Sequence, residues 1–407
     1  MIMTSGKRWL TAAFVGTIPL LIDLVYLYQR GQETAPINIP AYAPLPSPNG
    51  FDLYMKAAHE LASAKSTANL TPAEVTAPNG LVAQSGGYGA WLNSQTSTWA
   101  LMAQAKTLPT RLPNLRATDL PVLHWAPLRE LARAQAVRIQ EAKRIGRWDE
   151  AANIGLDTLE MGRNLEHGAS LINGLVSMAI EAVAFPPLED VPAHLDAAQA
   201  KRAARRLEGV INTAQPYSDV LREEKWRAVT ALNTTGTLSN SRHATVFESV
   251  FAPRVSLVPG AIATMNALIP QADKPKAAQK IVSPSNDFAD ACPDFSSATT
   301  KTLYNNARRN TQERLLLLRL ALHAYALEHG AYPPQLASLA PLYMQKVPVD
   351  PYGKGELFRY QPSGSSYILW SIGPDGLDNR ATPIPLKAGQ KRVVIYPDSK
   401  GDIVAHP

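Results

Sequence analysis

A long apolar segment near the N-terminus constrains this chain more than any other feature. Residues 9–28 read WLTAAFVGTIPLLIDLVYLY. At 1.5 Å per residue a helix of that length spans about 30 Å, the thickness of a bilayer's hydrocarbon core. Lys7 and Arg8 precede the segment, and their positive charge favours an N-terminus on the inner side. Residues 1–30 are therefore predicted to form a single-pass anchor in the inner (cytoplasmic) membrane, with the bulk of the chain periplasmic.

Two other interpretations of this segment stay open. A cleaved signal peptide has an apolar core of about 7–15 residues, which is shorter than this run, although Ala41-Tyr42-Ala43 resembles a cleavage triplet. The other alternative is a buried helix of a water-soluble domain. Asp23 is costly in lipid, but it lies near the end of the run, where a side chain can reach the interface. The length of the run favours the uncleaved anchor.

The composition of the chain excludes several classes of protein. The 407 residues include a single cysteine, Cys292, so neither an intrachain disulfide framework nor a cysteine-rich zinc module can form. The formal net charge is +6, but the basic residues are scattered, which argues against a nucleic-acid partner. Charged residues make up 18% of the sequence and hydrophobic residues 45%, a balance typical of a folded chain with a substantial core.

Proline content and helical periodicity divide the rest of the chain. Residues 31–49 are rich in proline and lack an apolar period, which predicts an extended spacer. Residues 50–270 place apolar side chains three and four positions apart, which predicts a helical domain. Gly146 fits a helix C-cap with a positive φ, and the GRWDEA turn at this position resembles that of tetratricopeptide-type helical hairpins. Residues 271–300, with several prolines and mixed charge, predict a linker.

The remaining segment, residues 301–407, combines one long helix with short strands. Residues 302–330 have a broad apolar face that includes an LLLL block, and Gly330 ends the helix. A VPVDPYGK turn, two strands joined at Gly364 and a SIGPDG segment with an acidic loop follow. In this order, the features resemble the C-terminal half of the major pseudopilin of the type II secretion system. The resemblance covers residues 305–380 and implies a long helix packed on a small antiparallel sheet.

The expected fold is mainly α with a C-terminal α+β module: an N-terminal transmembrane helix, a helical-hairpin bundle, then the pseudopilin-like unit. The chain departs from the pseudopilin pattern at its N-terminus, where Gly6 is followed by Lys7 and the glutamate of the processing motif is missing. We therefore do not expect the chain to be stacked into a fibre in the usual manner. Beyond the acidic loop, residues 392–396 and 402–405 predict a further β-hairpin.

In the pseudopilin family the acidic loop binds calcium, and the resemblance implies the same role here for Asp375, Asp378 and Asn379. The two aspartates match as carboxylate ligands and Asn379 as a carbonyl donor, and calcium takes six to eight oxygen ligands. The alternative is a structural turn held by hydrogen bonds from the backbone to these side chains. Asp350-Pro351 predicts a structural turn whose aspartate caps backbone N–H groups.

The sequence carries none of the common catalytic motifs. It contains no H-E-x-x-H, P-loop, dinucleotide-binding or G-x-S-x-G pattern. We therefore expect a non-enzymatic, membrane-anchored envelope protein with a protein-interaction or structural role, associated with a type II secretion or pilus-like system through an unidentified protein partner. One alternative is an envelope hydrolase with its site in the helical domain, for which His124, His167 and Glu181 are the residues to examine. The other is a calcium-responsive sensor.

Overall fold

The fold comes from a computed structural model that describes residues 37–68, 86–114, 116, 125–235, 254–280, 282, 293–386 and 393–407. The expected anchor, residues 9–28, lies outside the described residues. The α-helices are α2 (Gly50–Thr67), α4 (Gly86–Ser94), α5 (Thr96–Ala105), α6 (Ala126–Arg144), α7 (Trp148–Asn164), α8 (Leu171–Leu188), α9 (Ala197–Thr213), α10 (Tyr217–Thr235), α12 (Arg254–Leu268) and α14 (Pro293–His329). The 3₁₀-helices are η1 (Val191–His194), η2 (Ile269–Gln271), η3 (Lys276–Ala278) and η4 (Leu336–Leu339), and the strands are β1 (Arg359–Ser363), β2 (Ser366–Ser371) and β3 (Ile403–Ala405).

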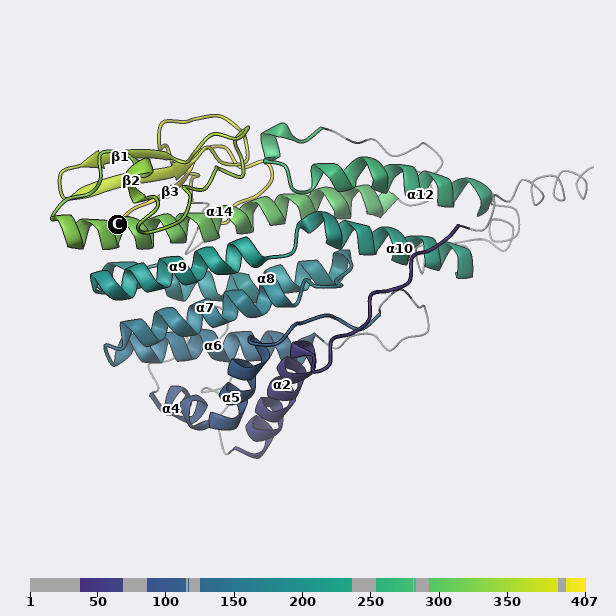
Figure 1. The fold of residues 1–407 in the computed structure, drawn as a ribbon, viewed down its shortest axis with the longest axis horizontal. Helices are drawn as coiled ribbons and strands as arrows, with labels where there is room; N and C mark the ends of the chain where they lie inside the picture. Colours follow the sequence, from purple (N-terminus) through teal and green to yellow (C-terminus); the bar gives the residue numbers. More distant parts are fainter. Residues whose placement is uncertain are drawn as a thin grey trace, which may run out of the picture.

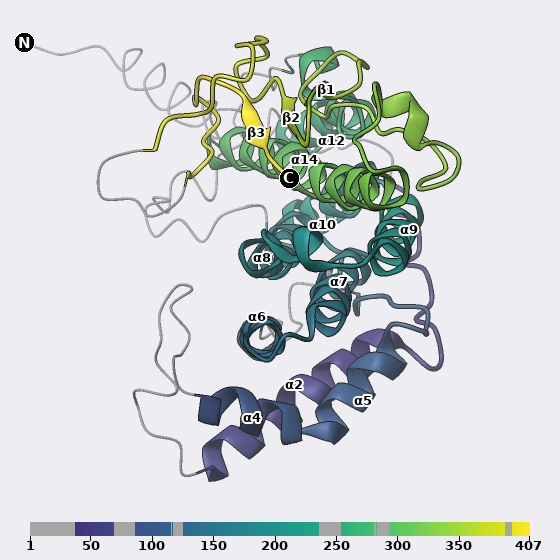
Figure 2. The same ribbon diagram turned by 90° about the vertical axis from the view of Figure 1, so that its left-hand side faces the viewer.

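The elements stack in layers, with α14 between the sheet and helices α6 to α9 (Figures 1 and 2). The sheet has the order β1-β2-β3, both pairs are antiparallel, and it lies against one side of α14. Helices α8 and α9 pack on the other side of α14, and α7, α6 and the group α2, α4 and α5 follow below them. The expectation of a mainly helical chain with a small antiparallel sheet near the C-terminus is confirmed.

Local sequence signals set several helix ends. Asn49 caps α2, because its side chain accepts a hydrogen bond from the N–H of Phe51 at 3.2 Å. Asp196 and Gln199 form a capping box at the start of α9. Gly146 has a φ of +75° after α6, as its C-cap position predicts, and this turn lets α7 fold back on α6.

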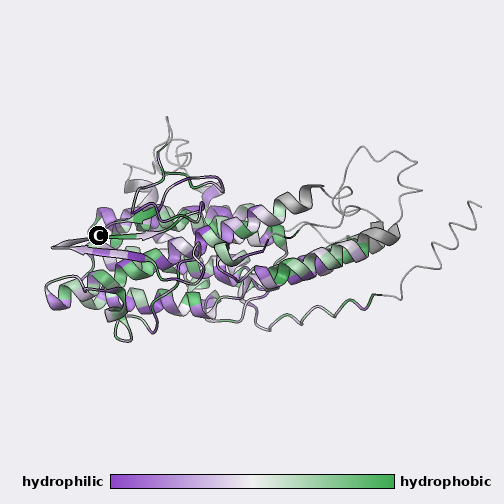
Figure 3. Cartoon of the chain, turned by 90° about the horizontal axis from the view of Figure 1, so that it is seen from above, coloured by the Kyte–Doolittle hydropathy of each residue, from purple (hydrophilic) through white to green (hydrophobic). Residues whose placement is uncertain are grey.

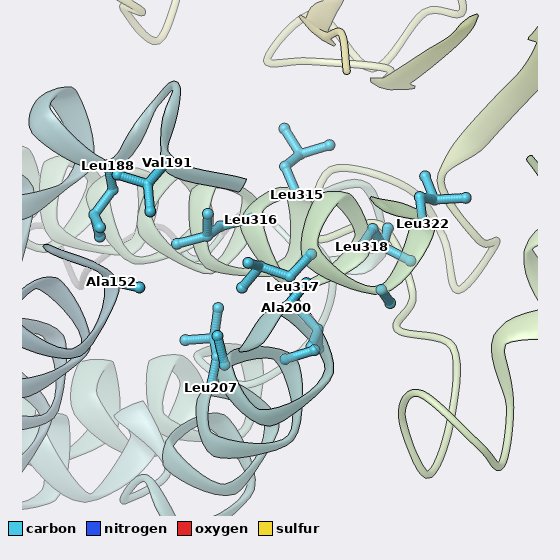
Figure 4. Packing of buried hydrophobic residues seen from close by; sticks show 14 of the residues in the cluster. Ala152, Leu188, Val191, Ala200, Leu207, Leu315, Leu316, Leu317, Leu318 and Leu322 are labelled. Atoms are coloured by element: carbon cyan, nitrogen blue, oxygen red, sulfur yellow. The ribbon is translucent and has the colours of Figure 1, made fainter. Parts of the chain in front are cut away.

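One hydrophobic cluster joins the helical body to the C-terminal unit. It contains buried residues from α6, α7, α8 and α9 together with the leucine block of α14 and residues of β2. Figure 4 shows Leu316 and Leu317 on the side of α14 that faces the other helices, while Leu315 points to the opposite side. Residues from both sides of the predicted linker, 271–300, therefore share one core, and α14 contributes to it on two faces.

A second cluster fills the opposite part of the helical body. It includes Phe51 and Tyr54 of α2, Leu128 and Leu131 of α6, and Ile180 of α8. The helices are accordingly amphipathic, and Figure 3 shows hydrophobic and hydrophilic residues alternating along them. Among the described residues, α8 is the helix long and apolar enough to cross a membrane, but 56% of that window is buried inside the protein, as in a core helix.

Two expectations about the C-terminal part need correction. The hairpin predicted between residues 392–396 and 402–405 is wrong: residues 393–396 form no strand, and β3 pairs with β2 in the register Leu369 to Ala405 and Ser371 to Ile403. The partner of β3 is therefore distant in sequence, and a local turn signal could not reveal it. The long helix begins at Pro293, within the segment predicted as a linker.

Candidate functional site

Five charged side chains meet in the interior where α14 crosses α7 and α8. We call Arg163, Glu166, Glu181, Arg309 and Glu313 the buried network. All five are buried, and Glu166, Glu181 and Glu313 have an exposed fraction of 0%. Lone charges of this kind are almost never placed in a protein core, because removing a charge from water is costly unless it is paired.

The two arginines of the network hold the three carboxyl groups together. Arg163 Nε donates to Glu313 Oε1 at 2.9 Å and lies 3.8 Å from Glu181 Oε2. Arg309 Nη1 donates to Glu181 Oε1 at 3.1 Å and also to Glu166. Since Arg309 and Glu313 belong to α14, these bonds tie the C-terminal helix to α7 and α8 across the middle of the molecule.

Burial and neighbouring charges set the pKa values of the network carboxyl groups differently. Arg163 and Arg309 contact the three carboxyl groups, and the Arg314 guanidinium also acts on Glu313. Burial raises the pKa of Glu181 to about 8, opposed by Arg309 and Arg163 and assisted by the Glu313 and Glu166 carboxylates. For Glu313 burial acts in the same direction, but the Arg163 charge and hydrogen bond outweigh it and leave its pKa below the usual value. Glu181 is therefore the protonated member at neutral pH.

Small residues allow α7 and α8 to approach closely enough for these bonds. A Cβ placed on Gly162 would lie 2.2 Å from Glu181 Cγ, and one placed on Gly155 would lie 2.4 Å from Leu188 Cδ2. Both glycines are in the interior of α7, where glycine itself weakens a helix. Their place in the helix is explained by packing against α8.

Next to the network lies a cavity of about 250 Å³. Arg163 and Arg309 of the network line it, together with residues of α14, the connection from α9 to α10, residues 272–279 and the turn at 349–351. Glu166, Glu181 and Glu313 are not among the lining residues. The cavity therefore presents the cationic side of the network and not its carboxyl groups.

Of the three residues predicted for a hydrolase, Glu181 and His167 lie in the described part of the chain. Glu181 is in the buried network, sealed from solvent. His167 lies after α7 with Nδ1 3.2 Å from the carbonyl oxygen of Asn164, and burial lowers its pKa. His124 lies outside the described residues. A carboxyl group with no exposed surface cannot contact a substrate in this conformation, so Glu181 acts on structure and charge.

The acidic loop places its predicted calcium ligands among protein donors. Asp375 accepts hydrogen bonds from the backbone N–H of Leu377 and of Gly401, both at 3.1 Å. Asp378 accepts from the Trp370 indole N–H at 3.0 Å, from the N–H of Arg380 at 3.0 Å and from Arg359 Nε at 3.2 Å. The Asn379 amide lies beside Asp375, and the N–H of Asn379 donates to Asp402 at 3.2 Å.

These hydrogen bonds make the loop a turn that is stabilised by its own aspartate side chains. Within the described ranges no three His, Cys, Asp or Glu side chains are arranged as a metal site. The calcium assignment of Asp375, Asp378 and Asn379 stays a prediction. Asp350 behaves as the turn predicts: its carboxylate accepts hydrogen bonds from the N–H groups of Tyr352 and Ile372 at 3.0 and 2.9 Å and from the Ser371 hydroxyl at 2.7 Å.

Sequence reasoning identified one member of the network and missed four. Glu181 stands out because it interrupts the apolar run of α8. Arg163 and Glu166, and likewise Arg309 and Glu313, are three and four residues apart, a spacing that usually marks surface ion pairs on a helix. The apolar residues beside each of these two pairs were a signal that the pairs could be buried. The sequence does not show, however, which face of α14 is covered by other helices. No protein-family model, curated protein or solved structure matches this chain.

Proposed function

We propose that this chain is a non-enzymatic, membrane-anchored envelope protein with a protein-interaction role, associated with a type II secretion or pilus-like system. Residues 9–28 anchor it in the inner membrane with the N-terminus inside, and the described body lies on the periplasmic side. In this proposal the C-terminal unit, which resembles a pseudopilin, docks a protein partner from that system.

The position of α14 carries the proposal. The helix has the sheet on one side and α8 and α9 on the other, and its centre is bonded into the buried network through Arg309 and Glu313. A fibre subunit must offer its long helix to neighbouring copies. Here the chain's own helices cover that surface, so the pseudopilin-like unit is displayed on a fixed body and interacts through its outer loops.

Exposed apolar side chains on the C-terminal loops suit such a contact. Leu377, next to the acidic loop, is 63% exposed, and Leu386 is 53% exposed. Val393 and Val394 are also exposed in the segment that leads to β3. A contiguous exposed apolar patch marks a protein contact surface, and in this proposal the loop leucines and valines form such a patch. The absence of catalytic motifs and the sealed position of Glu181 support a role that is not enzymatic.

Site-specific photo-crosslinking from the intact membrane-anchored chain tests this proposal. A photoreactive amino acid at Leu377 should give an adduct with an identified subunit of a secretion or pilus-like apparatus. Ile172, at the start of α8, is the matched control because it is equally exposed at 63% but lies on the helical body. An adduct with the same subunit at both positions, or none at Leu377, would reject the docking surface. Recovery of the intact chain in the soluble cytosolic fraction would reject the anchor.

A further inference from the structure

The cavity beside the buried network is built from both halves of the molecule. Its walls come from α14, from the connection between α9 and α10, from residues 272–279 and from the turn at 349–351. A hydrogen bond of 2.6 Å from the N–H of Lys276 to the carbonyl of Pro351 joins two of these walls. Its volume of about 250 Å³ is slightly below the roughly 300–1,000 Å³ of pockets for drug-sized ligands. A cavity of this volume has room for a small molecule only.

Two further cations line this cavity without a direct ion pair. Arg314 Nη1 donates to the carbonyl oxygen of Val349 at 2.9 Å, and Lys274 Nζ donates to the Gln271 amide oxygen at 3.2 Å. Neither has a salt bridge within the part of the chain that the structure describes, and Lys274 is exposed. Burial lowers the pKa of Arg314, and the Glu313 and Asp350 carboxylates oppose this shift. The single described carboxylate of the lining, Asp273, accepts the N–H of Ser218 at 3.1 Å.

The uncharged polar groups of the lining also have donors to spare. The side-chain oxygen of Asn306 accepts from Arg309 at 2.6 Å, and that of Asn310 accepts from Arg163 at 2.7 Å. Both oxygens are therefore occupied. The Asn310 NH₂ group donates to Asn306 Oδ1 at 3.5 Å, so the NH₂ group of Asn306 is the end left to bind something else. Arg309 Nε and the Tyr217 hydroxyl, both on lining residues, are buried without a hydrogen-bond partner. Buried polar groups in a native structure are normally paired, so a set of unused donors requires an explanation.

We propose that this cavity binds a small molecule carrying a carboxylate or phosphate group, with its anionic oxygens against Arg314, Lys274 and the Asn306 amide. Guanidinium, ammonium and amide N–H groups are the donors that proteins use for such oxygens. A neutral or cationic ligand would form no ion pair with Arg314 or Lys274. Because both halves of the molecule supply walls, a bound anion would brace α14 against residues 272–279.

Thermal unfolding of the full chain in detergent or nanodiscs tests the proposal, in a buffer free of polyvalent anions. Inorganic phosphate, succinate and chloride are compared at equal ionic strength. Phosphate or succinate should raise the melting temperature along a saturating curve, while chloride should not, and the more effective anion distinguishes phosphate chemistry from carboxylate chemistry. Equal responses to all three salts, or no response, would overturn the proposal.

Two variants locate the effect. Arg314→Gln should weaken the anion response at least tenfold, whereas Arg308→Gln, which removes the same charge from the same helix but lies outside the lining, should leave it unchanged. Equal losses in both variants would show a general charge effect and contradict the site. If Arg314→Gln does not fold, Lys274→Gln at the exposed rim replaces it, with the same tenfold loss expected.

Discussion

Glu181 is the residue whose proton sets the charge balance of the buried network. Its pKa is about 8 in the folded protein, against an ordinary value of 4.5. Between these values the folded state holds a proton that the unfolded chain releases, so the free energy of unfolding falls as pH rises through this window and levels off above it. At pH above 8 the folded protein holds Glu181 as a buried carboxylate.

The Glu181→Gln variant keeps the shape of the side chain without the titration. We expect it to match the wild type near pH 5 and to be more stable by about 4 kcal/mol near pH 9, from urea unfolding at each pH. Glu130→Gln removes the same charge from an exposed position on α6 and is the matched control. A wild-type stability that does not fall more steeply than that of Glu181→Gln between pH 5 and 8 would show that Glu181 is already ionised.

The acidic loop makes a separate prediction about metal removal. Asp375 and Asp378 are already hydrogen bonded to protein donors, so the loop is closed without calcium. Treating the calcium-loaded chain with EGTA should therefore change the melting temperature by less than about 1 °C, in contrast to sites where metal binding supplies folding free energy. A drop of several degrees that disappears in Asp378→Asn would instead establish the calcium site implied by the pseudopilin resemblance.

Among the elements, α7 and α8 depend on how closely their backbones approach. Gly162→Ala places a Cβ 2.2 Å from Glu181 Cγ, so α8 must shift and the network must loosen. We expect a loss of about 2 kcal/mol, the usual cost of overpacking a core. In α9, Gly209→Ala meets no atom within 4 Å and should stabilise by about 0.5–1 kcal/mol, because alanine is the better helix former. Chemical denaturation measures both, and stabilisation by Gly162→Ala would disprove the close packing.

Element prediction from the sequence succeeded where the signal is local. The C-cap at Gly146 and the hairpin turn at Gly364 lie where expected, because each depends on neighbouring residues. The strand at residues 403–405 was assigned the wrong partner, because pairing with β2 depends on chain segments more than 30 residues apart. The buried network was not predicted for a related reason. Helical spacing shows which residues share a face of a helix, but it does not show what packs on that face.

At the scale of the whole molecule, the shared core predicts that the two halves unfold together. Leu318 is fully buried in the cluster that joins α7, α9, α14 and β2. Leu318→Ala should cost about 3 kcal/mol. Hydrogen exchange followed by mass spectrometry should show the same loss of protection in the slowest amides of α7 and of β2. Leu377→Ala, at an exposed position, should change neither.

Loss of protection in β2 alone would contradict the shared core and would favour two independently stable units, as the predicted boundary at residues 271–300 suggests. Composition and apolar periodicity predicted the mainly helical class correctly. The same local signals predicted a domain boundary at residues 271–300. In the structure, α14 packs with segments from both sides of that boundary in one core.

The 37-residue length of α14 has a mechanical consequence. At 1.5 Å per residue this helix is about 55 Å long. The small sheet packs against part of it, and ion pairs of Arg309 and Glu313 near its midpoint connect it to α7 and α8. Because α14 is one continuous helix, a force applied to the outer loops is transmitted along it to the centre of the protein. Whatever holds the loops also pulls on the charges of the interior.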